Sequence, residues 1–319
     1  MESVFSQSFT DLEVIAVDDK STDESLQLLR AMDDARLKVV ALEQNLGPAG
    51  AAQRAMDLAQ GEYIVRMDAD DIMHPQRVER QVAFMDANPR IVASGGRIRL
   101  FGSEEVDWTF PLDPDDCRAE LLFGVPVPQP ASILRTQVLR SHNVRYQDHW
   151  PRIGEDWIYW MELAVHGEFA NLDDVLLYYR RGEQNISHGM DLTILRKEGV
   201  KVVLEHFGLG STDHDVEMHL LARKIFLRAP DQQRIRDYKA WLGHLEEHLK
   251  ESFPHEALRR RLHKAWTEIF HYLPAYGWAA ALEHLRLSKD RPWAHWSYLM
   301  KYRLKAGRRT SGKEMLPRA

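Results

Sequence analysis

The stretch at residues 61–71 reads Gly-Glu-Tyr-Ile-Val-Arg-Met-Asp-Ala-Asp-Asp. A turn residue opens it, a short apolar run follows, and three carboxylates, Asp68, Asp70 and Asp71, end it. Short continuous apolar runs are typical of strands buried on both faces of a sheet. Polar groups at the carboxyl ends of such strands lie where open α/β sheets bind their ligands. The stretch therefore predicts an α/β protein with an acidic site at one edge of its sheet.

Further apolar runs flank this stretch and alternate with helical patterns. Strands are predicted at residues 12–17, 37–42, 62–67, 91–101 and 176–179. Ser21 followed by Glu24 resembles a capping box, which predicts that a helix opens there. Strands that alternate with helices indicate a doubly wound α/β sheet flanked by helices. Beyond Ser187 the pattern becomes charged and helical, so we expect a helical extension over residues 189–319.

The D-x-D pattern at Asp68 and Asp70 has two explanations. The first is a metal site. Transfer from a nucleotide sugar, for example, leaves a diphosphate whose growing negative charge needs a hard cation. Mg²⁺ and Mn²⁺ prefer oxygen ligands and use few protein carboxylates together with phosphate oxygens. The alternative is that these residues only cap the helix that follows Pro75. Because a second acidic pair ends an earlier strand, we favour a site for Mn²⁺ or Mg²⁺.

That second pair is Asp18-Asp19, directly after the run at residues 12–17. A carboxylate there can accept the N–H of a uracil ring or a ribose hydroxyl, although the pair also suits a turn and a helix cap. Glu155-Asp156 stands at a predicted helix start, where acidic residues are favoured by the helix dipole alone. The same dipole would keep a carboxylate ionised, as a general base must be.

Composition limits the setting of the protein. The chain has 319 residues, a net charge of −6 and a single cysteine, Cys117, so no internal disulfide can form. That fits a reducing compartment, and no stretch approaches the ~18 apolar residues of a membrane span. We expect a cytoplasmic protein. Residues 291–319 carry eight Lys/Arg and one Glu among several aromatics. This tail suits either a peripheral contact with the inner face of the plasma membrane or a helix that packs its aromatics inward.

Taken in order, these motifs resemble those of bacterial family 2 glycosyltransferases with the GT-A fold, from Glu2 to about Ser187. The stretches that carry the resemblance are S-Q-S-F-T-D-L-E at 6–13, V-D-D-K-S-T-D at 17–23, G-E-Y-I and D-A-D-D at 61–64 and 68–71, V-P-Q-P at 127–130, G-E-D-W at 154–157, and Y-Y-R-R with N-I-S at 178–181 and 185–187.

The resemblance implies a role for each acidic residue. Asp19 would contact the uracil, next to Asp18. Asp70 would ligate the metal, while Asp68 would support it and face the ribose or donor sugar. Asp156 would be the general base, with Glu155 as its neighbour and less favoured substitute. Such enzymes invert the anomeric centre by direct displacement, and the metal steadies the leaving diphosphate.

The chain also departs from the family pattern. It opens inside the family's first helix, so the first strand and its P-x-Y-N loop have no counterpart here. Ala52-Gln53 stands where many members have Arg-Asn, Gln129 replaces a common His, and Gly182-Glu183 replaces the usual His-Gly.

The expected organisation is a nucleotide-sugar-binding half over residues 1–110, an acceptor-binding half over 111–188, and the helical extension over 189–319. The expected partners are a nucleotide-sugar donor and a glycan or lipid-linked acceptor, without nucleic acid. We expect an inverting, metal-dependent glycosyltransferase of surface-glycan biosynthesis that uses a UDP-linked sugar. The alternatives are a truncated or degenerate, non-catalytic homologue that binds sugar or a partner, and a nucleotidyltransferase, whose Gly-rich basic N-terminal loop is not visible in the sequence.

Overall fold

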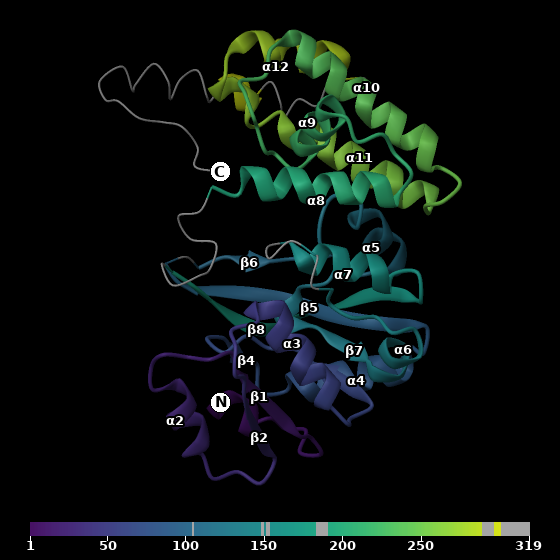
Figure 1. Cartoon of the computed structure of the whole chain (residues 1–319). Helices are drawn as coiled ribbons and strands as arrows, with labels where there is room; N and C mark the ends of the chain where they lie inside the picture. Colours follow the sequence, from purple (N-terminus) through teal and green to yellow (C-terminus); the bar gives the residue numbers. More distant parts are fainter. Residues whose placement is uncertain (104, 148–149, 151–153, 183–190, 289–296, 301–319) are drawn as a thin grey trace. The chain divides into compact units, whose positions relative to one another are not determined.

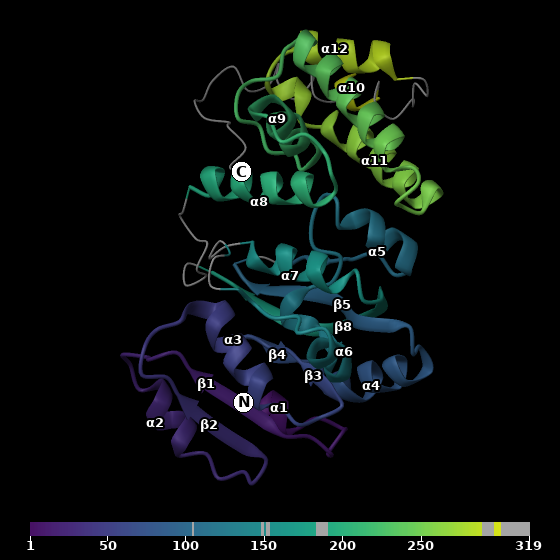
Figure 2. The ribbon, with the colours of Figure 1, turned by 45° about the vertical axis from the view of Figure 1, so that its right-hand side comes forward.

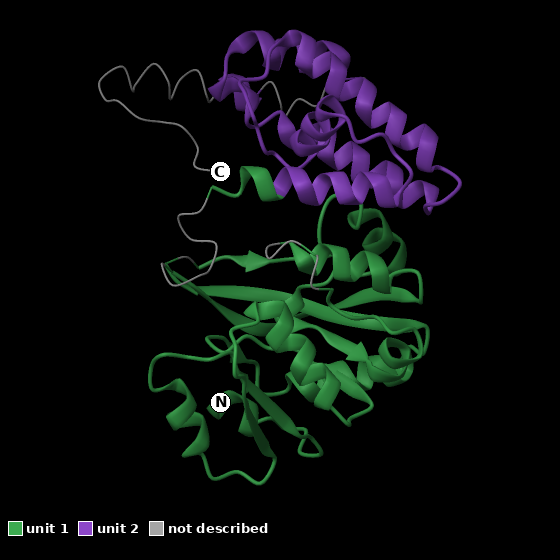
Figure 3. Ribbon diagram, viewed as in Figure 1, with its two compact units in different colours: residues 1–195 green, residues 196–319 purple. Residues whose placement is uncertain are grey.

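The computed structural model describes residues 1–103, 105–147, 150, 154–182, 191–288 and 297–300 (Figure 1). The chain divides into two compact units, residues 1–195 and 196–319 (Figure 3). Three features singled out from the sequence lie outside the described residues. They are the boundary expected near residue 189, the motif at 185–187, and the basic tail 291–319 apart from residues 297–300.

The first unit alternates helices and strands. Its strands are β1 (Val14–Asp18), β2 (Leu37–Ala41), β3 (Tyr63–Val65), β4 (Ile72–Met73), β5 (Ile91–Gly102), β6 (Asp107–Trp108), β7 (Ile133–Arg135) and β8 (Glu168–Arg181). Its helices are α1 (Glu2–Phe5), α2 (Ser25–Arg30), α3 (Gly47–Leu58), α4 (Arg77–Ala87), α5 (Pro114–Glu120), the 3₁₀ turn η1 (Gln129–Ala131), α6 (Thr136–Ser141) and α7 (Glu155–Leu163), and α8 (Thr193–His206) crosses into the second unit.

Among the described residues these strands form two sheets (Figures 1 and 2). The larger is mixed, with the order β3-β7-β5-β8-β4 and β6 paired to β5. Its centre is the long parallel pair of β5 and β8, in which Ser94 lies opposite Ala170 and Leu100 opposite Tyr179. The smaller sheet is the parallel pair of β1 and β2. The expected α/β sheet flanked by helices is therefore confirmed, with its strands divided between two sheets.

The separation of β1 from the larger sheet differs from the single sheet that the sequence predicted. Glu13, just before β1, accepts hydrogen bonds from the backbone N–H groups of Gln60 and Gly61, just before β3, at 2.5 and 3.2 Å. The two strands thus begin at neighbouring points, but no backbone ladder joins them in the described residues. As a result the apolar side chains at residues 14–17 stay half-buried.

The predicted capping box is also wrong. Helix α2 begins at Ser25, and neither Ser21 nor Glu24 caps it through its side chain. Instead the Asp18 carboxylate accepts from the backbone N–H of Ser21 at 3.2 Å, and Asp23 accepts from the N–H of Ser25 at 3.0 Å. Short acidic side chains compete for nearby N–H groups in this way, so a turn replaces the first helical turn.

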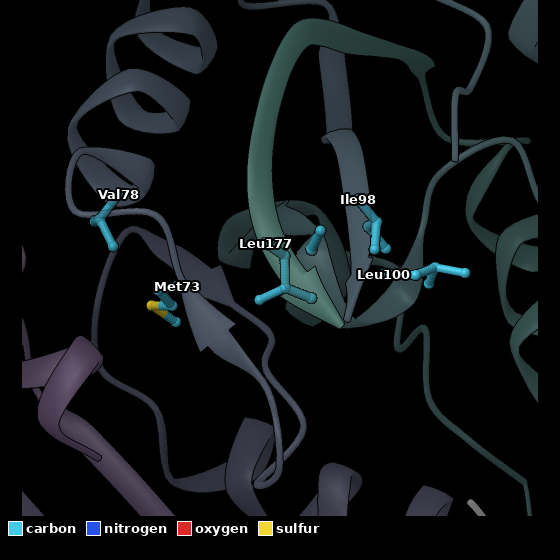
Figure 4. Close-up of a cluster of buried hydrophobic side chains, with 6 residues drawn as sticks. Met73, Val78, Ile98, Leu100 and Leu177 are labelled. Carbon is cyan, nitrogen blue, oxygen red and sulfur yellow. The ribbon is translucent and has the colours of Figure 1, made fainter. Parts of the chain in front are cut away.

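A buried apolar cluster supports the acidic loop that follows β3. Met73 and Val78, which follow the loop, pack with Ile98, Leu100 and Leu177 of the central strands (Figure 4). Val65 and Met67, which precede the loop, pack against the same cluster. Close-packed interiors tolerate little displacement, so the cluster fixes both ends of the loop.

The described part of the second unit contains helices and no strand. They are the rest of α8, α9 (Asp213–Ala222), α10 (Gln232–Leu249), α11 (His255–Ile269), the 3₁₀ turn η2 (Leu273–Ala275) and α12 (Trp278–Leu287). Thr212 and Asp215 form a capping box at the start of α9, and α10 packs against α9, α11 and α12. Throughout the described ranges of both units, every helix is too short or too polar to cross a bilayer.

Candidate functional site

The loop after β3 presents two carboxylates to solvent and buries the third. The Asp68 side chain is 42% exposed, Asp70 is exposed, and Asp71 is buried. The backbone N–H of Asp71 donates to the Asp68 carbonyl at 3.3 Å, which curls the loop into a turn. The D-x-D carboxylates therefore remain accessible to a ligand at the end of a strand.

The buried Asp71 ties this loop to the end of β8. Its Oδ1 accepts from the backbone N–H of Arg180 at 3.0 Å, and Arg180 Nε donates to the Asp70 carbonyl at 3.1 Å. Burial raises the pKa of Asp71 to about 7, while the Arg180 N–H acts in the opposite direction. Asp71 thus holds the loop in place instead of presenting a carboxylate to solvent.

The fully buried side chain of Arg77 supports the acidic loop after β3. Arg77, at the start of α4, donates from Nη2 to the carbonyls of Arg66 and Ser132 at 2.6 and 3.3 Å, and from Nε to Gln81 at 3.0 Å. Burial lowers the pKa of Arg77 to about 9, and the nearby charges of Asp71 and Asp68 oppose that shift. The acidic loop therefore rests on a buried positive charge.

The second acidic motif opens α7. Gly154 has a φ of +86°, a left-handed conformation that favours glycine, and the helix begins at the next residue. Asp156 Oδ1 accepts from the backbone N–H of Trp157 at 2.8 Å, and Trp157 is buried with its Nε1 donating to the Leu121 carbonyl at 2.7 Å. The buried face of α7 thereby fixes the direction of its first turn.

The pKa of Glu155 differs from the sequence-based expectation. The helix dipole favours an ionised carboxylate, but burial raises the pKa of Glu155 to about 7. The negative charges of Asp156 and Asp68 act in the same direction, and Arg66 opposes them. Desolvation therefore outweighs the dipole at this residue.

The fold brings the two acidic motifs together, although they are far apart in the sequence. Arg66 Nη2 lies 3.5 Å from Asp68 Oδ1, and the charges of Arg66 and Asp68 both act on Glu155. Tyr146 lies in the same field, since Arg66, Asp156 and Glu155 all affect the pKa of its hydroxyl, which burial raises to about 12. The Asp68 loop and the Glu155-Asp156 pair therefore lie within electrostatic range of one another.

Among the described residues, the hydrogen bonds of Asp18 and Asp19 lie outside that site. Asp19 accepts from the backbone N–H groups of Leu46 and Gly47 at 2.6 and 2.8 Å, and so satisfies donors at the start of α3. Asp18, at the end of β1, holds the turn at Ser21. The pair thus performs the turn and capping work that the sequence left open as an alternative, and its contact with a nucleotide stays a prediction.

The exposed carboxylates of Asp68 and Asp70 fit a hard cation. Within the described ranges, no group of three or more His, Cys, Asp or Glu side chains is placed to hold a metal ion. Mg²⁺ keeps several waters and binds through one or two carboxylates plus substrate phosphates, so a complete protein cage is not required. Asp70, with support from Asp68, is suited to such a partial site.

Sequence reasoning missed two members of the site, Arg66 and Tyr146. The signal for Arg66 was available, because a charged residue that ends an apolar strand is seldom buried without partners. Tyr146 had no comparable signal. Its ring stacks on Tyr159 with centroids 4.5 Å apart, its hydroxyl bonds Gln129, and its backbone N–H donates to Gln53 at 3.0 Å. These contacts join four separate parts of the chain, and no local pattern encodes them.

Two other features lie apart from the candidate site. A hollow of about 340 Å³ is lined by Ile91 and Glu168, the first residues of β5 and β8, whereas the acidic loop meets the far end of β8. Cys117 is fully buried, and burial raises the pKa of its thiol well above the usual range. Only the thiolate is a strong nucleophile, so the Cys117 thiol is unreactive in this position.

The raised pKa of Glu155 predicts how stability depends on pH. The folded state holds the Glu155 proton up to about pH 7, whereas the unfolded chain releases it near the reference value of 4.5. Stability is therefore greatest below pH 4.5 as far as this group is concerned, and it falls as pH rises to 7, by at most about 3 kcal/mol. Glu155→Gln should remove this part of the pH dependence in calorimetry between pH 5 and 8. Glu162→Gln, on the exposed side of α7, is the matched control, and an identical pH dependence in wild type and Glu155→Gln would contradict the prediction.

Comparison with known proteins agrees with this geometry. A family model for glycosyl transferase family 2 matches residues 1–130. An uncharacterized glycosyltransferase of Haemophilus influenzae is 28% identical over 228 residues, which cover 66% of this chain and 70% of that protein. The succinoglycan biosynthesis protein ExoO of Rhizobium meliloti is 32% identical over 174 residues, which are 50% of this chain and 49% of ExoO, so the match spans about half of that relative.

The fold has counterparts among solved structures. The crystal structure of S. aureus TarS 1-349 in complex with UDP-GlcNAc superposes with a TM-score of 0.55 at 17% identity, and covers 95% of this chain and 86% of that one. At this identity the likeness concerns the fold alone. Residues 1–130 thus match glycosyl transferase family 2, the relatives are named as glycosyltransferases, and the chain is similar to them and has a GT-A-like fold.

Proposed function

We propose that the chain is an inverting, metal-dependent glycosyltransferase that moves a sugar from a UDP-linked donor to a hydroxyl group of a surface glycan or a lipid-linked acceptor. The observation that supports this most is the convergence of the Asp68 loop with Glu155-Asp156 in one electrostatic site. A transferase needs one group beside the leaving diphosphate and another beside the incoming hydroxyl, and these two motifs supply one each.

The acid pair at the start of α7 suits the acceptor side. Asp156 takes the proton from the acceptor hydroxyl, and the hydroxyl oxygen attacks C1 of the donor sugar. The bond from C1 to the diphosphate then breaks, with inversion at C1. Glu155, with a pKa of about 7, is largely protonated below neutral pH and so limits the repulsion around Asp156. Because the two carboxyls are neighbours, their titrations are coupled, and the pair is best regarded as one acid–base unit.

The loop after β3 suits the donor side. Asp70 would hold Mn²⁺ or Mg²⁺, Asp68 would support it and face the ribose or donor sugar, and the bound cation would stabilise the charge on the departing diphosphate. Arg180 keeps the loop in register through its contacts with Asp70 and Asp71. Asp18 and Asp19 would face the nucleoside from the end of β1, with acceptor capacity beyond the bonds described above.

Similar proteins support the choice of donor nucleotide and of biosynthetic process. The fold of TarS, whose structure is described as a complex with UDP-GlcNAc, suggests a uridine nucleotide, and the name of ExoO suggests polysaccharide synthesis. We extend both suggestions to this chain. We also propose the halves 1–110 and 111–188 as donor-binding and acceptor-binding parts, and a cytoplasmic location.

Nucleotide binding tests the proposal. Titration calorimetry with UDP, GDP and CDP, each with and without Mn²⁺, should give measurable binding for UDP only when Mn²⁺ is present, with GDP and CDP at least tenfold weaker, or ~1.4 kcal/mol. A preference for GDP would overturn the uridine assignment. Equal UDP affinity with and without Mn²⁺ would overturn the proposed metal dependence of nucleotide binding.

A further inference from the structure

Arg66 directly follows strand β3, two residues before the D-x-D motif, and hydrogen bonds hold its backbone N–H and its carbonyl. Its N–H donates to the Ser132 carbonyl at 2.9 Å, and its own carbonyl accepts from the buried Arg77 at 2.6 Å. Its side chain is only 13% exposed. The guanidinium is therefore directed by a rigid strand end and has little freedom to swing into solvent.

The guanidinium is incompletely paired. Nη2 lies 3.5 Å from Asp68 Oδ1, at the upper limit of a hydrogen bond, while Nη1 is buried and finds no hydrogen-bond partner in the described parts of the chain. Burying a charged group without full hydrogen bonding is unfavourable. Packing alone gives no reason for a cation at this position, since an apolar side chain would fill the space without that cost.

What surrounds Arg66 supplies the reason. Its charge acts on Glu155 from α7, on Tyr146 from the segment before α7, and on Tyr159 one turn further along that helix. The charge of Asp156 acts on Glu155 and Tyr146 with the opposite sign. Arg66 is thus a cation that contacts Asp68 and whose charge also reaches Glu155. The three carboxylates of Asp68, Glu155 and Asp156 come from two separate segments and would otherwise repel one another.

We propose that Arg66 is a positioning residue that holds the donor-side carboxylate Asp68 and the acceptor-side pair Glu155-Asp156 at working separation, an inference that rests on the proposed function. Arg66 acts through these carboxylates and is assigned no contact with substrate. Its neighbour Arg77 has a different task, because that guanidinium bonds backbone carbonyls and Gln81 under the loop.

Three variants of the full chain separate charge from shape. Arg66→Met keeps much of the length and removes the charge, whereas Arg66→Lys keeps the charge and loses the planar fork. Arg99→Met is the matched control, since Arg99 makes an exposed ion pair with Asp107 at 2.7 Å on β5 and β6, and its charge is not among those that shift the pKa of Glu155. Circular dichroism and calorimetry first establish that each variant is folded.

The first measurement does not depend on enzyme activity. Carboxyl ¹³C NMR, with the Glu155 signal assigned by Glu155→Gln, follows the titration of Glu155. Arg66→Met should raise the apparent pKa of Glu155 by about one unit or more, which is the scale for losing an adjacent opposite charge. Arg66→Lys should raise this pKa by less, and Arg99→Met should leave it unchanged. An unchanged titration in folded Arg66→Met would overturn the proposal.

The second measurement tests the consequence for transfer. UDP release is measured with UDP-glucose and UDP-GlcNAc as probes in the presence of Mn²⁺. For Arg66→Met, kcat should fall at least tenfold and KM should change less. The acid limb of its pH profile should move to higher pH. Arg66→Lys should recover part of kcat. Near-wild-type kcat in Arg66→Met would overturn the positioning role. If the wild-type chain releases no UDP from any donor while the Glu155 titration still moves, the proposed function fails and the electrostatic link from Arg66 to Glu155 stands.

Discussion

Asp156→Asn should lower the turnover of sugar transfer by roughly a hundredfold or more, the usual scale for a lost general base. The amide keeps the size of the carboxylate and can still accept from the Trp157 N–H, the contact that Asp156 makes at the start of α7. It cannot take a proton from the acceptor hydroxyl. Binding of UDP should therefore stay nearly intact, because the loss concerns the acceptor side of the reaction.

Glu155→Gln is the matched control, and we expect a milder effect. Glutamine imitates the protonated form that Glu155, with a pKa of about 7, already adopts at and below neutral pH. Steady-state kinetics of both variants between pH 6 and 8 distinguish the two carboxyls. Near-full transfer in Asp156→Asn, together with a large loss in Glu155→Gln, would assign the base to Glu155. Unchanged transfer in both would reduce the pair to a helix cap.

Asp70→Ala should weaken UDP binding in the presence of Mn²⁺ by tenfold or more, which corresponds to ~1.4 kcal/mol. Asp70 is exposed at the tip of the loop, and its carbonyl, not its carboxylate, is used by Arg180. Removing the carboxylate should thus leave the fold of the loop intact while it deletes a ligand for the cation. Titration calorimetry measures the change.

Asp115→Ala serves as the control for the Asp70 variant, because Asp115 is an exposed aspartate in the first turn of α5. Its UDP affinity should match that of the wild type. If Asp70→Ala binds UDP as tightly as Asp115→Ala in folded protein, the D-x-D motif does not hold the metal, and capping or turn formation would be its whole role.

The elements that could be predicted from sequence are those with local causes. The apolar run before Asp68 and the Gly154 turn before Glu155 both place a carboxylate at the end of a regular element, and strand ends or helix starts are determined by neighbouring residues. For that reason the acidic loop after β3 and the acid pair opening α7 lie where the sequence placed them.

Other features depended on distant parts of the chain. The charge state of Glu155 depends on burial by the surrounding structure, which outweighs the local dipole. The link from Arg66 to α7 joins segments that only the folded sheet brings together.

The proposed reaction transfers sugar from a UDP-linked donor with inversion at C1 and with a divalent cation. Proton NMR of the product formed from α-linked UDP-sugars and a glycan or lipid-linked acceptor, in parallel reactions with Mn²⁺ and with EDTA, tests it most directly. We expect a β-linked product that forms with Mn²⁺ and not with EDTA, and that the Asp156→Asn variant forms far more slowly. An α-linked product, or equal product formation in EDTA, would contradict it.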